Sequence, residues 1–177
     1  MIYFVRHGQT EANVKHIYTG EVNVPLTAVG VTQAEAAAEK LKGVRIDRIF
    51  CSPLLRAKQT MQAIAKFHPD APIVFDERLK ERGDGEMEGK PIGAEDDLRW
   101  NLHAPHREAY GESIQDAFAR VKAFYTEILS KYSTENVLVV AHCGIGRLSK
   151  CFFDGFPADG DLTKIKIHNA DAIILQA

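Results

Sequence analysis

Two histidines in this 177-residue chain follow short apolar segments, in surroundings suited to phosphoryl chemistry. The first stands in Arg6-His7-Gly8, directly after residues 2–5, and the second, His142, follows residues 137–141. A neutral imidazole is available near pH 7, because the unperturbed pKa of histidine is about 6.5. Its nitrogen lone pair can attack phosphorus when fixed donors neutralise the charge of the phosphoryl group. The pair therefore indicates a candidate phosphoryl-transfer site.

Two arginines and a glutamate could complete such a site. Arg6 and Arg56 each carry a planar guanidinium, which binds phosphate oxygens through paired hydrogen bonds. Cleaving the ester of a poorly acidic alcohol also requires a proton for the leaving oxygen, and Glu81 follows the apolar segment 73–75 closely enough to supply it. Taken alone, Arg56 and Glu81 are each also compatible with a solvated surface position.

Predicted secondary structure places these residues together. Runs of β-branched and aromatic residues predict strands buried on both faces at 2–5, 48–51, 73–75 and 137–141. Apolar spacing predicts helices at 27–42, 54–67, 113–132 and 145–153, with Thr27 as the first N-cap. This alternation predicts an α/β fold with a mostly parallel sheet covered by helices on both sides. Ligands of such sheets bind at the carboxyl ends of the strands, where His7 and His142 are expected to meet.

Two further segments complete the predicted organisation of a single domain spanning residues 1–177. The stretches 164–167 and 172–175 flank Asn169-Ala170-Asp171 and predict a hairpin at one sheet edge. Residues 90–110 lack clear periodicity and form a predicted lid-like insertion over a polar ligand. Its aromatic and cationic side chains are Trp100, His103, His106, Arg107 and Tyr110.

Composition excludes several classes of protein. The formal net charge of -2 offers no basic excess for nucleic acid or an anionic membrane, so neither is an expected partner. The three cysteines, Cys51, Cys143 and Cys151, form no C-x-x-C pair and are expected to be reduced thiols. The apolar run at residues 2–5 is too short for a signal peptide or a membrane span. A cytoplasmic protein is the resulting expectation.

An ordered set of motifs across about 140 residues resembles the histidine phosphatase superfamily, also called the phosphoglycerate mutase-like family. The motifs are Val5-Arg6-His7-Gly8-Gln9-Thr10 with Asn13, Thr19-Gly20, Pro25-Leu26-Thr27 with Gly30, residues 52–60, Leu79-Lys80-Glu81, Gly111-Glu112-Ser113 and Val140-Ala141-His142. Residues 17–27 look most like small bacterial phosphatases of the α-ribazole phosphatase type. The departures are Gln9, Cys51 and Cys143, which stand where the family often has glutamate, serine and glycine.

The resemblance implies a fold and a set of roles. The fold is a three-layer α/β/α sandwich with a six-stranded mixed sheet. His7 becomes phosphorylated, Glu81 donates the proton, and Arg6, Asn13, Arg56 and His142 hold the phosphoryl group, without a metal or other cofactor. Thr19, Gly20, Arg82 and Cys143 are expected on the substrate-binding side. The implied activity is hydrolysis of a small phosphorylated metabolite. The sequence does not identify the alcohol part of this substrate, and it does not indicate the oligomeric state of the enzyme.

Three other functions fit the residues less well. A cysteine-dependent phosphatase needs five residues between cysteine and arginine, whereas three separate Cys143 from Arg147. A metal-dependent hydrolase needs a cluster of metal ligands, and His103 and His106 are the only histidines close together in the sequence. Pro105 lies between them and disfavours a helix that would present both rings on one side. A non-catalytic phosphate-binding module would not require Glu81 beside the nucleophile and cationic clamps.

Mutase activity through the same phosphohistidine is the main alternative to hydrolysis. A mutase must exclude water while its substrate reorients, which generally takes a substantial closing segment. Only residues 90–110 separate Gly89 from Gly111, and two residues follow Leu175. We expect neither segment to be long enough to close over the site, so water should reach phosphorylated His7. One feature favours the mutase alternative. The carboxylate of a phosphoglycerate could be bound by Arg82, Arg99 and Arg107.

Overall fold

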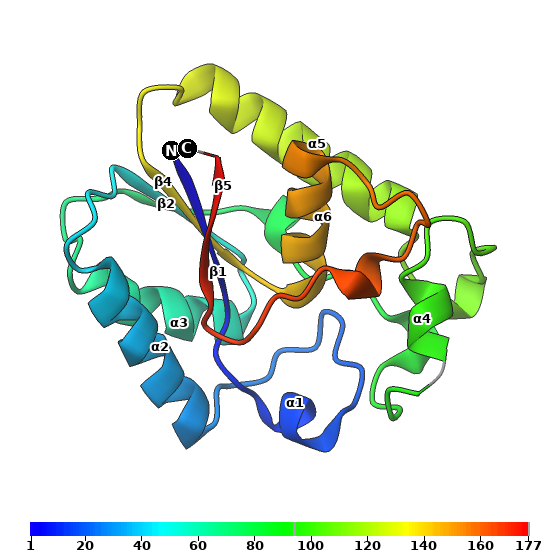
Figure 1. Cartoon of the computed structure of the whole chain (residues 1–177). Helices are drawn as coiled ribbons and strands as arrows, with labels where there is room; N and C mark the ends of the chain where they lie inside the picture. The colour runs from blue at the N-terminus through cyan, green and yellow to red at the C-terminus, as the bar shows by residue number, and fades with distance from the viewer. Residues whose placement is uncertain (94, 177) are drawn as a thin grey trace.

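A mixed sheet lies at the centre of the protein. The computed structural model describes residues 1–93 and 95–176, and the strands in these ranges are β1 (Ile2–Arg6), β2 (Arg48–Cys51), β3 (Ile73–Phe75), β4 (Val137–Ala141) and β5 (Ala172–Gln176). They lie in the order β3-β2-β4-β1-β5, and every neighbouring pair is parallel except β1 with β5. The predicted mostly parallel, mixed sheet is confirmed (Figure 1).

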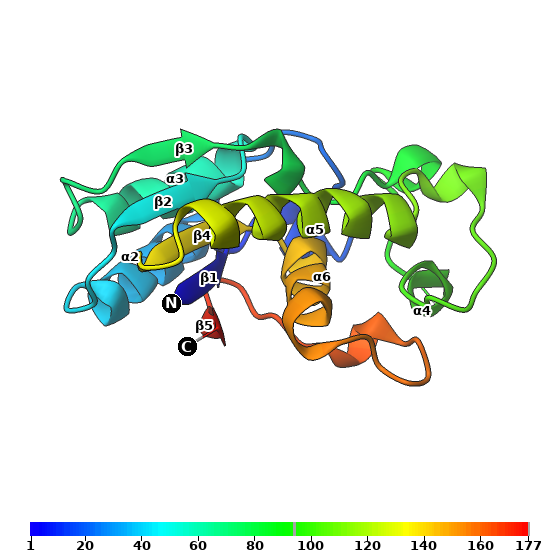
Figure 2. The same ribbon diagram turned by 90° about the horizontal axis from the view of Figure 1, so that it is seen from above.

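Helices cover both faces of this sheet. They are α1 (Glu11–Lys15), α2 (Ala28–Leu41), α3 (Leu55–Ala65), α4 (Glu95–Arg99), α5 (Ile114–Lys131) and α6 (Cys143–Asp154). Helices α2 and α3 pack on one face and α5 and α6 on the other, which gives the predicted three layers (Figures 1 and 2). Within the described ranges, no helix is both long enough and apolar enough to cross a bilayer.

The apolar strand residues explain these layers. Successive side chains of a strand point to opposite faces, so Phe4 packs toward α5 and α6 while Val5 packs toward α2 and α3. Every residue of β4 is buried, as expected for a strand covered on both faces. Each buried side chain of this size stabilises the fold by roughly 1.5–3 kcal/mol relative to an exposed position. Burial of this sheet therefore fixes the strand ends that carry the candidate site.

The predicted hairpin, and with it the sixth strand, is wrong. Residues 164–167 form no strand, because their carbonyl groups accept hydrogen bonds from side chains. Arg6 donates to the carbonyl of Ile167 at 2.6 Å, and Arg147 donates to that of Ile165 at 3.3 Å. Ile167 is buried in the core shared with α6. The segment thus runs over α6, and β5 alone pairs with β1 at this edge.

Strand β3 also differs from its predicted environment. Ile73, Val74 and Phe75 are all exposed, whereas the sequence suggested burial on both faces. The reason is position, because β3 is the edge strand and pairs only with β2. An apolar run of three residues does not reveal whether a strand is central or at an edge.

The predicted lid-like segment is held by backbone hydrogen bonds on two sides. The amide of Tyr18 donates to the carbonyl of Lys90 at 3.0 Å. Ten residues on, the carbonyl of Trp100 accepts from Leu162 at 2.9 Å, and the amide of Leu102 donates to Gly160 at 2.8 Å. Residues 90–93 and 95–102 therefore form a wall beside the sheet end. That residues 90–110 open as a lid stays a prediction.

Candidate active site

The parallel pairing of β1 and β4 brings the two histidines together. Arg6 is in register with Ala141, so His7 and His142 both follow the carboxyl ends of neighbouring strands. Their ring centroids are 5.2 Å apart, and both side chains are buried. The expectation that the two imidazoles meet at this edge is confirmed.

Hydrogen bonds leave one nitrogen of His7 free. Its Nδ1 lies 2.7 Å from the carbonyl oxygen of Gly8, which can only accept, so Nδ1 carries the proton and Nε2 keeps its lone pair. The Gly8 amide donates to Thr60 Oγ1 at 3.0 Å, and this hydroxyl donates to the carbonyl of Arg56 at 2.9 Å. Helix α3 thus holds Gly8, whose carbonyl group orients the imidazole, as a nucleophilic histidine requires.

The same tautomer, with the proton on Nδ1, is assigned to His142. Ser52 Oγ accepts from the amide of Leu54 at 3.3 Å and lies 2.7 Å from Nε2 of His142. This hydroxyl can donate its hydrogen to Nε2, and on that basis we assign the ring proton of His142 to Nδ1. This Nδ1 is buried and has no hydrogen-bond partner in the described part of the chain. It is a donor that a ligand at His7 could satisfy.

Both imidazoles are held neutral by their surroundings. Burial lowers the pKa of His7 and His142 well below the usual value near 6.5, and the nearby Arg56 guanidinium lowers both further. Each ring therefore remains uncharged at neutral pH. For His7 this keeps the Nε2 lone pair available, and for His142 it preserves a neutral donor.

These shifts predict a loss of stability in mildly acidic solution. As the pH falls below about 6.5, the unfolded chain binds protons on these histidines while the folded chain does not, so the free energy of unfolding falls. Each fully shifted histidine contributes a slope of up to about 1.4 kcal/mol per pH unit. Urea titrations in phosphate-free buffer should show a shallower slope for His142→Gln than for the wild type. An equal slope in both proteins would contradict the neutral buried state.

Two guanidinium groups flank the histidines. Arg6 at the end of β1 donates to the carbonyl of Ile167, and its buried Nε has no partner among the described residues. Arg56 on α3 donates to the carbonyls of Gly20 and Val22, at 2.8 Å each. Burial lowers the pKa of Arg56, and the nearby carboxylate of Glu81 opposes this, yet an arginine stays protonated in a protein. Two fixed positive charges therefore face His7.

Glu81 lies at the same cavity, with its carboxyl group held by two amides. Gly144 donates to Oε2 at 3.1 Å, and Arg82 donates to Oε1 at 2.9 Å. A β-carbon on Gly144 would lie 2.4 Å from Oε1 of Glu81 and 2.4 Å from the ring of Trp100. Glycine is thus required where the first turn of α6 approaches the carboxyl group.

The loop after β1 supplies part of the cavity wall. Asn13 and Thr19 line the cavity, although Asn13 Oδ1 also accepts from the amide of Thr10 at 3.0 Å and so fixes the start of α1. Gly20 has a φ of +48°, and its amide donates to Asp84 at 2.7 Å. A side chain at Gly20 would meet Glu88 and the backbone of Asp84, so this residue shapes the wall through its backbone.

The far half of the cavity is built around Trp100. Arg82 donates to the carbonyls of Arg99 and Glu112 at 2.6 Å each, and its guanidinium lies 4.8 Å from the Trp100 ring. Arg147 of α6 lies 5.0 Å from the same ring. Its Nε donates to Ile165, and its terminal nitrogens make no hydrogen bond within the described residues. Arg147 is therefore a free cation on this side.

Together these residues enclose a cavity of about 170 Å³. Five guanidinium groups and three carboxylates line it, namely those of Arg6, Arg56, Arg82, Arg99, Arg147, Glu81, Asp84 and Asp96. With both histidines neutral, positive charge is in excess, although the whole chain has a net charge of -2. The positive charge is thus concentrated at one place, which is where the composition would require any anion site to lie.

The structure gathers most of the predicted site residues here. His7, Arg6, Arg56, Glu81, Asn13, Thr19, Gly20, Arg82 and Cys143 line the cavity, while His142 lies against His7 without lining it. Arg107 and His103 lie outside it, because Arg107 is placed over Tyr110 and His103 against Gly160. In residues 1–93 and 95–176, no three His, Cys, Asp or Glu side chains group as metal ligands would.

Several lining residues were not predicted as site residues from the sequence, among them Asp96, Ile92 and Arg147, the last of which entered only the rejected cysteine-phosphatase interpretation. Burial raises the pKa of Asp96, and the nearby Arg147 and Arg99 oppose this shift. Arg147 had one usable signal, since it lies four residues after Cys143 and hence on the same helix face. Because α6 begins at Cys143, residues 143–147 are helical and do not form a separate phosphate-binding loop.

Comparison with known proteins identifies the relatives of this chain. The family model described as histidine phosphatase superfamily (branch 1) matches residues 2–177. A probable phosphatase of Schizosaccharomyces pombe is 30% identical over 171 residues, which cover 94% of this chain and 80% of that protein. A 2,3-bisphosphoglycerate-dependent phosphoglycerate mutase of a Methylobacterium species is 37% identical over 174 residues, covering 90% and 83%.

Solved structures agree with this assignment. The α-ribazole phosphatase of Shigella flexneri superimposes with a TM-score of 0.80 at 28% identity, over 97% of this chain and 87% of that one. The resemblance to enzymes of this type is therefore confirmed in both sequence family and fold. The names of the relatives include both phosphatases and mutases, so the site must indicate which activity to expect.

Proposed function

The chain belongs to the histidine phosphatase superfamily, and from this membership we propose that it is a phosphomonoester hydrolase whose nucleophile is His7. The observation that carries the proposal is the free Nε2 of His7, facing a cavity that also holds Arg6, Arg56 and Glu81. Nucleophile, charge-neutralising donors and a carboxyl group are thus at one place. This is the set that transfer of a phosphoryl group from an alcohol requires.

The reaction proceeds in two steps. In the first, Nε2 of His7 bonds to phosphorus while the P–O bond to the alcohol breaks, and Glu81 gives its proton to the departing oxygen. In the second, water attacks the phosphohistidine, its proton passes to Glu81, and the P–N bond breaks to release phosphate. Arg6, Arg56 and the Nδ1–H of His142 stabilise the phosphoryl oxygens in both steps. Because these donors are side chains, the proposed reaction needs no metal ion.

The far half of the cavity favours an alcohol that carries a carboxylate. Arg147 presents terminal nitrogens without partners in the described chain, whereas Arg99 is paired with the carboxylate of Asp84. A guanidinium binds a carboxylate in a planar, paired arrangement. The cavity of about 170 Å³ also limits the substrate to a small molecule. We therefore propose a small phosphorylated hydroxy acid as the substrate class, in a cytoplasmic enzyme.

A matched pair of substrates tests this proposal. 3-Phosphoglycerate and glycerol 3-phosphate are both phosphomonoesters of a primary alcohol, and they differ in a carboxylate against a hydroxymethyl group. We expect free phosphate from both and a preference in kcat/KM of about 10-fold to 100-fold for the acid, the effect of one charged hydrogen-bonded contact. Arg147→Met should remove most of that preference.

The outcomes separate the parts of the proposal. Equal kcat/KM values for the two substrates would overturn the substrate class and leave the phosphatase activity standing. To test mutase activity, 2,3-bisphosphoglycerate is added with 3-phosphoglycerate, and both 2-phosphoglycerate and phosphate are measured. Rapid isomerisation with negligible phosphate release would overturn hydrolysis as the function.

A further inference from the structure

Glu81 lies in an irregular segment, so something other than regular secondary structure must hold its backbone. A single turn of 3-10 helix at residues 77–79 precedes it, and the next such turn covers residues 85–87. We infer that Arg120, on the neighbouring helix α5, is the positioning residue that fixes Glu81 for proton transfer. This inference rests on the proposed role of Glu81 as the proton donor.

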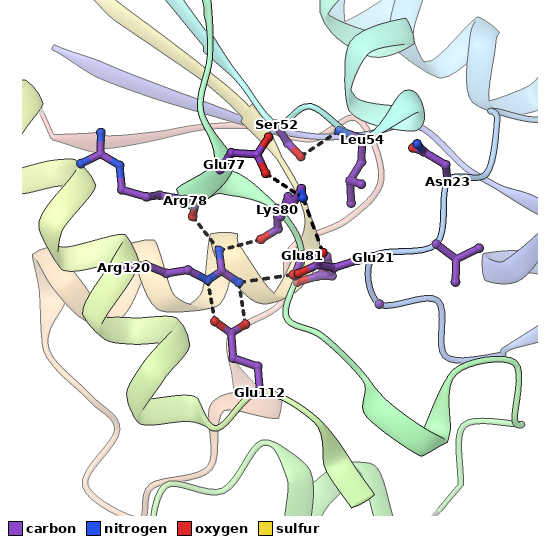
Figure 3. A network of polar contacts seen from close by, with 12 residues as sticks. Glu21, Asn23, Ser52, Leu54, Glu77, Arg78, Lys80, Glu81, Glu112 and Arg120 are labelled. Carbon is purple, nitrogen blue, oxygen red and sulfur yellow. Dashed lines mark hydrogen bonds and ion pairs between the residues drawn. The ribbon is translucent and has the colours of Figure 1, made fainter. Parts of the chain in front are cut away.

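Arg120 binds the backbone on which Glu81 is carried (Figure 3). One terminal nitrogen donates to the carbonyls of Arg78 and Lys80, at 2.6 and 2.8 Å, and the other donates to the carbonyl of Glu81 at 3.3 Å. Three carbonyl groups within four residues thus converge on one guanidinium. A helix of 18 residues supplies the rigid support.

Glu112 fixes the orientation of Arg120 in turn. Its two carboxylate oxygens accept from Nε and from a terminal nitrogen of Arg120, at 2.6 and 2.7 Å (Figure 3). A guanidinium has five N–H groups, and the five hydrogen bonds of Arg120 occupy all of them. A lysine has three N–H groups around one nitrogen and cannot reproduce this arrangement. The contact is therefore specific to arginine.

The carboxyl end of Glu81 is held separately from its backbone. Gly144 and Arg82 donate to its two oxygens, while Arg120 holds the main chain on the other side. Losing Arg120 would leave the carbonyls of Arg78, Lys80 and Glu81 without these donors and let the segment move relative to α6. A displacement of about 1 Å of a reacting group can cost roughly 100-fold in rate. The expected effect is on the proton-transfer step.

Arg78 offers a matched control on the same segment. Its guanidinium also links the segment to α5, through Glu127 at 2.8 Å, and pairs with Asp76 at 2.6 Å. These partners are side chains only, so Arg78→Met removes ion pairs between the same two elements without removing a donor from the carbonyl of Glu81. A general loosening of the segment would affect both variants alike.

The test compares leaving groups. We expect Arg120→Met to lower kcat/KM on an alkyl phosphate about 10-fold to 100-fold more than on p-nitrophenyl phosphate, whose acidic leaving group needs no proton. Circular dichroism melts identify the folded variants. If Arg120→Met does not fold, Arg120→Lys takes its place, and it should show the same selective loss on the alkyl phosphate because lysine retains the charge but not the five hydrogen bonds. Arg78→Met should affect the two substrates equally. In a Glu81→Gln background, Arg120→Met should add no selective loss, because the acid is already absent.

Each result has a defined meaning. Equal losses on both substrates for the folded Arg120 variants, or a selective loss that persists in Glu81→Gln, would overturn the positioning role of Arg120. If Glu81→Gln shows no dependence on the leaving group, the assignment of Glu81 as the acid fails, and this inference fails with it. Selectivity in Glu81→Gln without selectivity in the Arg120 variants would overturn this inference alone.

Discussion

Replacing His7 with alanine is expected to abolish turnover, lowering kcat by roughly 10⁴-fold or more, the scale for removing a covalent nucleophile. The reason lies in the tautomers of the two imidazoles. In the assigned tautomer neither nitrogen of His142 has a free lone pair, because Nε2 bonds to Ser52 and Nδ1 carries the proton, so His142 cannot take over as the nucleophile. Phosphate release from an aryl phosphate is the measurement.

A histidine outside the site, His168, provides the control for the His7→Ala variant. His168 is exposed and does not line the cavity, so His168→Ala should retain wild-type turnover. Circular dichroism should show that His7→Ala is folded. Turnover of the folded His7→Ala protein within tenfold of wild type would contradict a nucleophilic role for His7.

Replacing Glu81 with glutamine should slow alkyl phosphates far more than aryl phosphates. A glutamine keeps the size of the side chain but has no acidic proton, and only a basic leaving oxygen requires one in the transition state. General acid catalysis contributes about 100-fold to 10,000-fold, so the selective loss should fall in that range. The measurement is kcat/KM for glycerol 3-phosphate and p-nitrophenyl phosphate with each protein.

Neighbouring carboxylates serve as controls for Glu81. Glu86 is exposed and Glu88 accepts from the amide of Glu21 at 3.3 Å, and neither lines the cavity. Glu86→Gln should therefore behave like the wild type on both substrates. Equal losses on both substrates in Glu81→Gln, or a selective loss in Glu86→Gln, would move the acid role away from Glu81.

The parts of the fold that depend on local pattern could be predicted from the sequence. The continuous apolar run at β4 and the helical spacing in α5 each identified their element, and Thr27 caps α2 through the amide of Gly30 at 3.0 Å. Because parallel strands end at one edge, His7 and His142 could also be placed together. These features follow from periodicity and topology alone.

Features that depend on distant partners could not be predicted. The hairpin at residues 164–167 fails because Arg6 and Arg147 occupy its carbonyl groups, and these arginines are far away in the sequence. Likewise, Arg120 is separated from Glu81 by 39 positions, and its place on α5 resembles any polar position on an amphipathic helix. Only the folded chain shows which carbonyl groups such a side chain meets.

The covalent state of the enzyme during turnover tests the central claim most directly. Glu81→Gln should accumulate the intermediate from a labelled aryl phosphate, because hydrolysis of the phosphohistidine also needs a proton acceptor. A short incubation, an alkaline quench and a peptide map then locate the label. We predict label on the peptide containing His7 and none on the corresponding peptide of His7→Ala. Label on Cys143 or any other residue would contradict the account.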